Sequence, residues 1–327
     1  MKNKLKIVSY LIGILLAIII ALLSYVKFKL PNVGDAPNLK VELSTQNIER
    51  GKYLANHVMV CIDCHSTRDW SLYSGPIVKG TEGKGGESFD QRFGFPGKYI
   101  SKNLTPYHLK NWTDGEIFRA ITTGVSKDGN ALFPIMPFHN YGQLDENDIN
   151  AVIAFIRTLP SVPFDVEPSS SDFPINFIIN TMPQKAKFTT IPNKLNTLEY
   201  GKYLVTAANC YDCHTKQEKG KFVGEAFAGG MAFKLSDKLT LRSANITSDK
   251  ESGIGNWSKE LFIQKFKQYD DSSFVLPKAN LNELQTVMPW TMYAGMTVDD
   301  LSAIYTYLQS TKAVKNKVEH FFYASIN

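Results

Sequence analysis

The sequence predicts an all-α chain, with one N-terminal transmembrane helix followed by two short helical domains. Three observations support this fold class. An uncharged run of 20 residues stands near the N-terminus. One set of short motifs then occurs twice in the same order, and each copy closes with apolar residues at helical spacing. The 327 residues are enough for two such domains and a connector between them.

The uncharged run extends from Ile7 to Val26 and is long enough to cross the hydrocarbon core of a bilayer as one helix. Three lysines precede it and two follow it, so that, with the amino terminus, the excess of positive charge is on the N-terminal side. This bias favours a single-pass membrane protein with a cytoplasmic N-terminus and the rest of the chain on the periplasmic or extracellular side. A cleaved signal peptide is the alternative, although the run exceeds the usual apolar region of about 7 to 15 residues.

The formal net charge of +5 comes from the N-terminal segment. The first 30 residues hold five lysines and no acidic residue, so the other 297 carry 31 basic and 31 acidic side chains. We therefore expect no nucleic-acid partner. Charge on the folded part is expected to orient a docking protein instead.

All four cysteines belong to two copies of the pattern Cys-x-x-Cys-His, at residues 61–65 and 210–214. This pattern is the attachment signature of c-type haem, in which two thiols bond the porphyrin and the adjacent imidazole ligates the iron. The sequence therefore predicts two covalently bound haem c groups. The cofactor-binding thiols are expected at Cys61, Cys64, Cys210 and Cys213, and the proximal iron ligands at His65 and His214.

Two other interpretations of the cysteines are one zinc site with four thiolate ligands and a redox dithiol. Neither explains why two of only six histidines directly follow the second cysteine of a pair. Attachment of c-type haem takes place outside the cytoplasm, which agrees with an exported chain.

An internal repeat is the second signal. Gly-Lys-Tyr-Leu begins ten residues before Cys61 and again nine residues before Cys210. Each haem motif is followed by an irregular, glycine-bearing stretch, by Asn-x-Thr, and by an Asn-Trp pair whose next residue can cap a helix. That residue is Thr113 in the first copy, where it forms a capping-box pattern with Glu116, and Ser258 in the second.

Each copy closes with a helix, which begins at Asp145 in the first copy and at Thr297 in the second. A connector with five prolines separates the copies, and its apolar residues suggest that it rests on a domain surface. The predicted organisation is a membrane anchor (1–30), a linker (31–46), a first repeat (47–160), a connector (161–196), a second repeat (197–312) and a C-terminal tail (313–327).

A haem iron held by one histidine has a second axial position, for which methionine is the expected ligand in an electron carrier. Met136 and Met288 are the candidates. Each is followed by proline and an aromatic residue, and each lies 13 residues before the first inward residue of the closing helix. The alternatives are Met292 or Met296 for the second haem, and His57 or His139 for the first.

The order of these motifs resembles the cytochrome c subunits of membrane-bound alcohol, aldehyde and gluconate dehydrogenases. The match is closest at Arg50–Leu54, Asn103–Pro106, Trp112 and Met136–Phe138, and the second copy departs from it at Tyr200 and Ser248. The resemblance implies two cytochrome c-like domains in a membrane-anchored dihaem cytochrome. Such a subunit accepts electrons from a dehydrogenase partner and passes them toward the respiratory chain. Members of that family commonly carry three haem domains and this chain has two, so the particular dehydrogenase is not implied.

The expected function is electron transfer by a subunit that is not itself an enzyme and has no catalytic residues. A dihaem cytochrome c peroxidase is the alternative, but it needs one iron with an open axial site, whereas this chain offers a matched methionine to each. A structural or sensory haem subunit is a third possibility.

Overall fold

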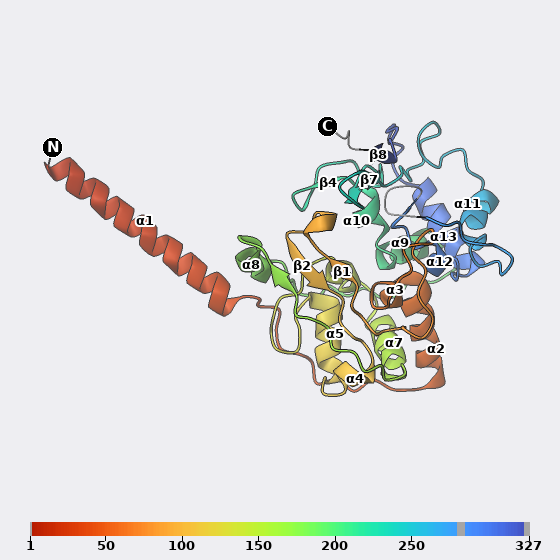
Figure 1. Ribbon diagram of the computed structural model, residues 1–327, viewed down its shortest axis with the longest axis horizontal. Helices are drawn as coiled ribbons and strands as arrows, with labels where there is room; N and C mark the ends of the chain where they lie inside the picture. The colour runs from red at the N-terminus through yellow and green to blue at the C-terminus, as the bar shows by residue number, and fades with distance from the viewer. Residues whose placement is uncertain (1, 280–284, 324–327) are drawn as a thin grey trace.

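The computed structural model describes residues 2–279 and 285–323 of the chain. Helix α1 (Lys2–Lys29) projects from a globular body, as Figure 1 shows. Of the described residues, α1 is the one helix long and apolar enough to cross a membrane, and its apolar window is not buried against the rest of the chain. A signal sequence has the same character, so the helix fits either a membrane anchor or an export signal.

Both repeats use a similar order of helices. The first repeat contains α2 (Thr45–Tyr53), α3 (Cys61–Cys64), α4 (Pro106–Leu109), α5 (Asp114–Thr123), α6 (Phe138–Tyr141) and α7 (Glu146–Arg157). The second contains α9 (Thr197–Ala207), α10 (Cys210–His214), α11 (Lys259–Lys267), α12 (Trp290–Tyr293) and α13 (Val298–Gln309). The haem motif of each repeat is therefore a short helix, α3 or α10.

The predicted helix starts are confirmed by the caps. Thr113 and Glu116 form a capping box at the start of α5. The side chain of Ser258 caps α11, Asp145 caps α7, and Thr297 caps α13. These side chains satisfy backbone N–H groups that have no partner within the helix.

The opening and closing helices of each repeat cross at a glycine. Helix α2 packs on α7, and α9 packs on α13. A Cβ atom on Gly51 would lie 1.8 Å from the carbonyl oxygen of Ala151, and one on Gly201 would lie 2.0 Å from that of Ala303. The glycine that begins each Gly-Lys-Tyr-Leu motif is thus required by the close approach of two backbones.

The prediction of an all-α chain is wrong. The described residues are about 40% helix and 9% strand, and the strands form three antiparallel sheets. The strands are β1 (Ser88–Phe89), β2 (Gly97–Ile100), β3 (Ser170–Ser171), β4 (Gln217–Glu218), β5 (Lys221–Phe222), β6 (Ala232–Lys234), β7 (Leu239–Arg242) and β8 (Phe321–Tyr323). Each has two to four residues, too few for an alternating pattern to show in the sequence. Most lie in the glycine-bearing stretches that follow the haem motifs, which were expected to be irregular.

The two repeats share one core. A single cluster of buried apolar side chains includes residues of both. At its edge the hydroxyl of Tyr53 donates to the carboxylate of Asp300, and the hydroxyl of Tyr203 donates to that of Asp148 over 2.7 Å. The tyrosines hold the same place in the two Gly-Lys-Tyr-Leu motifs, and the aspartates hold the same place in the two closing helices. The contact between the repeats is therefore reciprocal, as in an interface with two-fold symmetry.

The connector lies along the first repeat, which agrees with the expectation that it rests on a domain surface. Its strand β3 pairs with β2. The side chain of Asn103 donates to the carbonyls of Val162 and Phe164 over 2.9 and 3.0 Å. Farther along, the connector forms the short helix α8 (Ile175–Ile178) and the 3₁₀ turn η3 (Ile179–Thr181).

Candidate haem sites

The residue that directly precedes each haem motif has left-handed backbone angles. Val60 precedes α3 with φ +46°, and Asn209 precedes α10 with φ +56°. This conformation costs roughly 1–2 kcal/mol for a residue such as Val60, and asparagine adopts it more readily. Its presence at the same place in both repeats indicates that the entry of the motif is held by its surroundings, as is common at functional sites.

The two motif histidines are oriented in the same way. Nδ1 of His65 lies 2.6 Å from the carbonyl oxygen of Lys102, and Nδ1 of His214 lies 2.8 Å from that of Ala244. A carbonyl oxygen can only accept, so Nδ1 carries the proton and Nε2 keeps its lone pair. Burial lowers the pKa of both imidazoles, which favours the neutral form. Each ring thus has the tautomer that a metal ligand requires.

The repeated Asn-x-Thr motif supports these carbonyls. Lys102 and Ala244 directly precede Asn103 and Asn245, whose side-chain oxygens accept from the backbone N–H groups two residues on, over 2.9 and 3.0 Å. Both asparagines are buried, and both amide groups also donate to neighbouring carbonyls. This turn fixes the direction in which the acceptor carbonyl faces the histidine.

A glycine closes the other side of each histidine. The N–H of Gly85 donates to the carbonyl of His65 over 2.8 Å, and that of Gly229 donates to the carbonyl of His214 over 2.7 Å. A Cβ atom at Gly85 would lie 2.6 Å from the Lys102 carbonyl, and one at Gly229 would lie 2.5 Å from the backbone of Ala244. Both glycines have positive φ. The sequence showed only a glycine-rich loop here, not its contact with the histidine.

The four motif thiols are free and partly buried. Burial raises the pKa of each to about 12, so the thiols are neutral at physiological pH. Among residues 2–279 and 285–323, no three or more His, Cys, Asp and Glu side chains gather in a way that could hold a metal ion, so a four-thiolate zinc site is not supported. Unpaired thiols beside an imidazole with a free Nε2 fit covalent attachment of haem c.

The two candidate methionines stand in matched segments, at residues 136–141 and 288–293. Met136 and Met288 are partly buried against the core, and each carbonyl accepts a 2.8 Å bond from the residue two positions on. Each segment ends in a buried tyrosine that contacts the chain two residues before a haem motif. The Tyr141 hydroxyl donates to the Met59 carbonyl over 2.9 Å, and the Tyr293 hydroxyl donates to that of Ala208 over 2.7 Å.

These tyrosine contacts tie each methionine segment to the haem motif of its own repeat. The sequence analysis did not predict these contacts. A tyrosine stands five residues after each methionine, and this recurrence could have indicated them. The alternative ligands Met292 and Met296 are buried in the core.

Contacts also run from the first methionine segment to the second haem motif. Nε2 of His139 lies 2.7 Å from the carboxylate of Asp212. The side chain of Asn140 donates to Asp212 over 3.3 Å and also to Asn209. Nδ1 of His57, the other histidine considered as a ligand, lies 2.9 Å from the Met292 carbonyl across the same interface.

The two motif aspartates have different partners. Asp63, in the first motif, pairs with Arg68 of its own repeat over 3.0 Å. The second repeat has Gln217 in place of that arginine, and its side chain donates to the Asp212 backbone carbonyl instead. The carboxylate of Asp212 therefore takes its partner, His139, from the other repeat.

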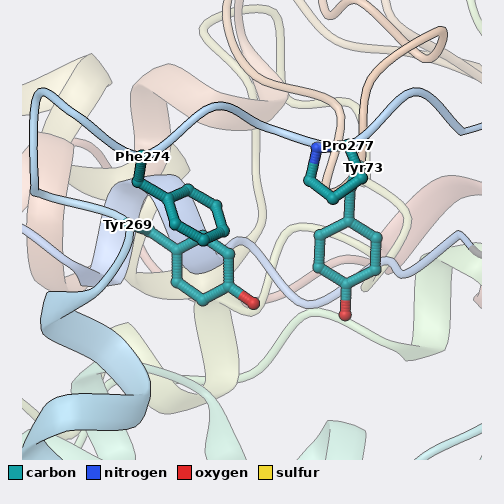
Figure 2. Close-up of a pocket in the computed structure, with 4 residues that line it drawn as sticks. All are labelled: Tyr73, Tyr269, Phe274 and Pro277. Atoms are coloured by element: carbon teal, nitrogen blue, oxygen red, sulfur yellow. The ribbon is translucent and has the colours of Figure 1, made fainter.

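A surface pocket lies at the seam between the repeats, beside the second methionine segment. Figure 2 shows its lining by Tyr73 of the first repeat and by Tyr269, Phe274 and Pro277 of the second. The ring of Tyr269 stacks on that of Trp290, with centroids 5.6 Å apart and planes at 25°. The next residue after Tyr73, Ser74, donates its hydroxyl to the Met288 carbonyl over 2.7 Å.

The second repeat matches a known protein family. Residues 198–312 match the family described as cytochrome c. The second repeat is therefore similar to cytochrome c domains over almost its whole length. The family supports covalently bound haem c in that domain. The first repeat shares the domain's haem motif, histidine contacts and crossing glycine.

Most of the chain is similar to cytochrome c subunits of dehydrogenases. It is 27% identical to the cytochrome c subunit of a quinone-type alcohol dehydrogenase of Gluconobacter oxydans, over 82% of this chain and 55% of that protein. It is 27% identical to the fructose dehydrogenase cytochrome subunit of Gluconobacter japonicus, over 82% and 53%. A dihaem c-type cytochrome of Cereibacter sphaeroides is 25% identical over 47% and 53%. The chain thus spans little more than half the length of these relatives.

Proposed function

We propose that the chain is a membrane-anchored dihaem cytochrome c that relays electrons from a dehydrogenase partner toward the respiratory chain. The observation that carries the proposal is the duplicated setting of the motif histidine. In both repeats its Nδ1 is bound to a backbone carbonyl and its own carbonyl is bound by a glycine N–H. The similarity to dehydrogenase cytochrome subunits supports the role and the kind of donor.

The proposed sites are matched in composition. Cys61, Cys64, His65 and Met136 would hold one haem, and Cys210, Cys213, His214 and Met288 the other. When bound, each haem supplies an iron that changes between the ferric and ferrous states. The protein's part is to hold the imidazoles in one tautomer, exclude water from them and keep the two sites in one body.

The reciprocal interface favours exchange between the two sites within one molecule. The bond between His139 and Asp212 joins the first methionine segment to the second haem motif. Ser74, from the first repeat, contacts the carbonyl of Met288. Helix α1 would keep this unit at the membrane, on the periplasmic or extracellular side, close to a respiratory acceptor.

Haem analysis of the full chain, purified from membranes, tests the cofactor count. We expect two thioether-linked haems per chain, and one after either His65→Ala or His214→Ala, because each histidine serves a separate site. A preparation with no thioether-linked porphyrin would refute the proposal. Peroxide turnover that disappears with one haem site would instead support a peroxidase.

Replacement of the methionines tests the axial ligands. Met136→Ala and Met288→Ala should each make one ferric haem high-spin and lower its midpoint potential, because a thioether ligand favours the ferrous state. Met292→Leu keeps the side-chain volume and is the control, for which we expect an unchanged spectrum. Electron paramagnetic resonance and redox titration measure both quantities. If Met288→Ala leaves the spectrum unchanged and Met292→Leu changes it, Met292 is the ligand and Met288 is not.

A further inference from the structure

The connector carries a short apolar segment that the body of the protein leaves uncovered. Residues 173–179 read Phe-Pro-Ile-Asn-Phe-Ile-Ile and include α8. None of these seven residues is buried, and the side chains of Phe173 and Ile178 are 81% and 43% exposed. Exposed large apolar side chains that cluster in this way mark an interaction surface. We call residues 173–179 the apolar platform.

The apolar platform lies beside the body-proximal end of α1. Helix α1 contacts α8 and the following turn η3. The side chain of Asn180 is 3.4 Å from the carbonyl of Val26, which is the last residue of the uncharged run. Figure 1 shows α8 on the side of the body from which α1 emerges. The platform therefore stands at the level where the apolar part of α1 ends.

The platform is held in place by the first repeat. The residue before it, Asp172, receives a 2.9 Å bond from the side chain of Gln91, and its N–H donates to the carbonyl of Pro96 over 3.0 Å. Two residues earlier, β3 pairs with β2. The apolar side chains are thus presented by an ordered backbone that is bonded to the body.

We propose that the apolar platform is a second membrane contact, which inserts into the headgroup boundary of the bilayer that α1 crosses. The inference rests on the proposed membrane anchor. We infer that lipid covers the platform, because the platform is continuous with the apolar part of α1. A bilayer around α1 would therefore reach the platform without any further partner. Lys27 and Lys29, which follow the apolar run, suit the same headgroup layer.

The contact would fix the orientation of the body. The first repeat, which holds the platform through β2, Gln91 and Pro96, would face the bilayer. The α11 region of the second repeat lies on the opposite side of the body from α1 (Figure 1) and would face away from it. An anchor alone leaves the body free to turn about the end of α1, whereas two contacts do not.

Photo-crosslinking of the full chain in phospholipid nanodiscs tests the inference. A benzoylphenylalanine replaces Phe173 in one preparation, Leu16 within α1 in a second, and Val275 in a third. Val275 is 85% exposed and stands in the loop after α11. We expect lipid adducts by mass spectrometry at positions 173 and 16 and none at 275. With the probe at position 173, Ile178→Asp should lower the lipid adduct several-fold, whereas Val275→Asp should not.

The outcomes separate the inference from the proposed function. Lipid adducts at position 16 without any at position 173 would refute the platform and leave the anchor intact. Crosslinking of position 173 to another polypeptide would also refute it, and would identify the platform as a protein contact. Absence of lipid adducts at position 16 would refute the membrane anchor, and the platform with it.

Discussion

At the scale of single residues, the matched motifs are explained by one arrangement built twice around a histidine. Asn103 and Asn245 form the turns that direct the carbonyls of the preceding residues toward Nδ1 of the two histidines. A hydrogen bond of this kind fixes the tautomer of a metal-ligating imidazole and raises its basicity. Asn-x-Thr, which in the sequence is only a recurrent triplet, therefore belongs to the site.

The buried tyrosines at the interface predict a loss of stability at alkaline pH. Burial, followed by the hydrogen bond to Asp300, raises the pKa of Tyr53 above its ordinary value of about 10. Burial and the nearby Asp148 do the same for Tyr203. A phenol with a raised folded-state pKa contributes stability that is complete below the unfolded pKa and is lost as pH rises toward the folded pKa. We expect the free energy of unfolding to hold steady up to about pH 10 and then to fall, by at most about 1.4 kcal/mol per pH unit for each tyrosine.

Urea unfolding of Tyr203→Phe between pH 8 and pH 12 measures this effect. The variant loses the bond that the hydroxyl donates to Asp148 and the bond that it accepts from the Asp145 N–H. It should therefore be less stable at pH 8, by about 1–3 kcal/mol, and its stability should fall less steeply above pH 10. Tyr323→Phe, in a side chain that is 55% exposed, is the matched control. Equal slopes for Tyr203→Phe and the unaltered chain would contradict the assignment.

The sequence identifies the candidate residues of the sites but not the contacts that support them. Two cysteines and a histidine lie within five positions, so their chemistry can be recognised locally. The contact of Tyr141 with Met59 spans 82 residues, and that of Tyr293 with Ala208 spans 85, so no local pattern could predict them. The partner of Asp212 lies in the other repeat, and no local sequence pattern indicates this contact.

At the scale of elements, the unequal spacing of the repeats has a structural counterpart. Residues Leu54–Val58 form a π-helical turn, η1, between α2 and the first haem motif, whereas α9 runs to the second motif as a regular helix. A π turn takes up one extra residue within a helix. The ten residues from Gly51 to Cys61 and the nine from Gly201 to Cys210 can thus deliver the two haem motifs in matching positions.

Deletion of one residue tests this explanation. Removal of Asn56, within η1, should turn the π turn into a regular helix and leave two haems per chain. Removal of Thr206, at the matching place in α9, should shift the second motif by about 100° around the helix, so that one haem is lost. Haem content per chain measures both. Equal loss of haem in the two deletions would contradict the role of the π turn.

The crossing glycines predict a second effect at this scale. Gly51→Ala and Gly201→Ala should each force two helix backbones apart, because the added Cβ would meet a carbonyl oxygen within about 2.0 Å or less. Overpacking of this kind typically costs about 1–3 kcal/mol, and a contact with rigid backbone belongs at the upper end. Lys52→Ala, at an exposed position of the same helix, is the control. Urea midpoints followed by circular dichroism measure the change, and a Gly51→Ala midpoint equal to that of Lys52→Ala would contradict the prediction.

The strands show why the fold class was wrong. Helices of nine residues or more have caps and apolar spacing that can be recognised, whereas strands of two to four residues do not. Two of the three sheets are completed by a strand from a distant segment, β3 from the connector and β8 from the C-terminal tail. Pairing between segments so far apart depends on the tertiary structure and not on local sequence.

At the scale of the whole molecule, the duplication gives two similar sites with different surroundings. In the first repeat the motif aspartate, Asp63, pairs with Arg68, which also pairs with Glu87 of the same repeat. In the second, Asp212 depends on His139 and Asn140 of the other repeat. The interface therefore has a part in the electrostatics of the second site that it does not have in the first, and the two haems should differ in potential.

This asymmetry leads to a prediction about the redox potentials. His139→Ala removes the closest hydrogen bond to the Asp212 carboxylate, which leaves more of its negative charge unbalanced beside the second haem. Unbalanced negative charge stabilises the ferric state, so the midpoint potential of the second haem should fall. Arg68 remains in place, so the potential of the first haem should change little. His108→Ala, at an exposed histidine of the first repeat, is the control. Redox titration of the full chain would resolve the two haems, with Met288→Ala used to mark which transition belongs to the second. A fall confined to the first haem, or a rise in the second, would show that the interface does not act on the second site through Asp212.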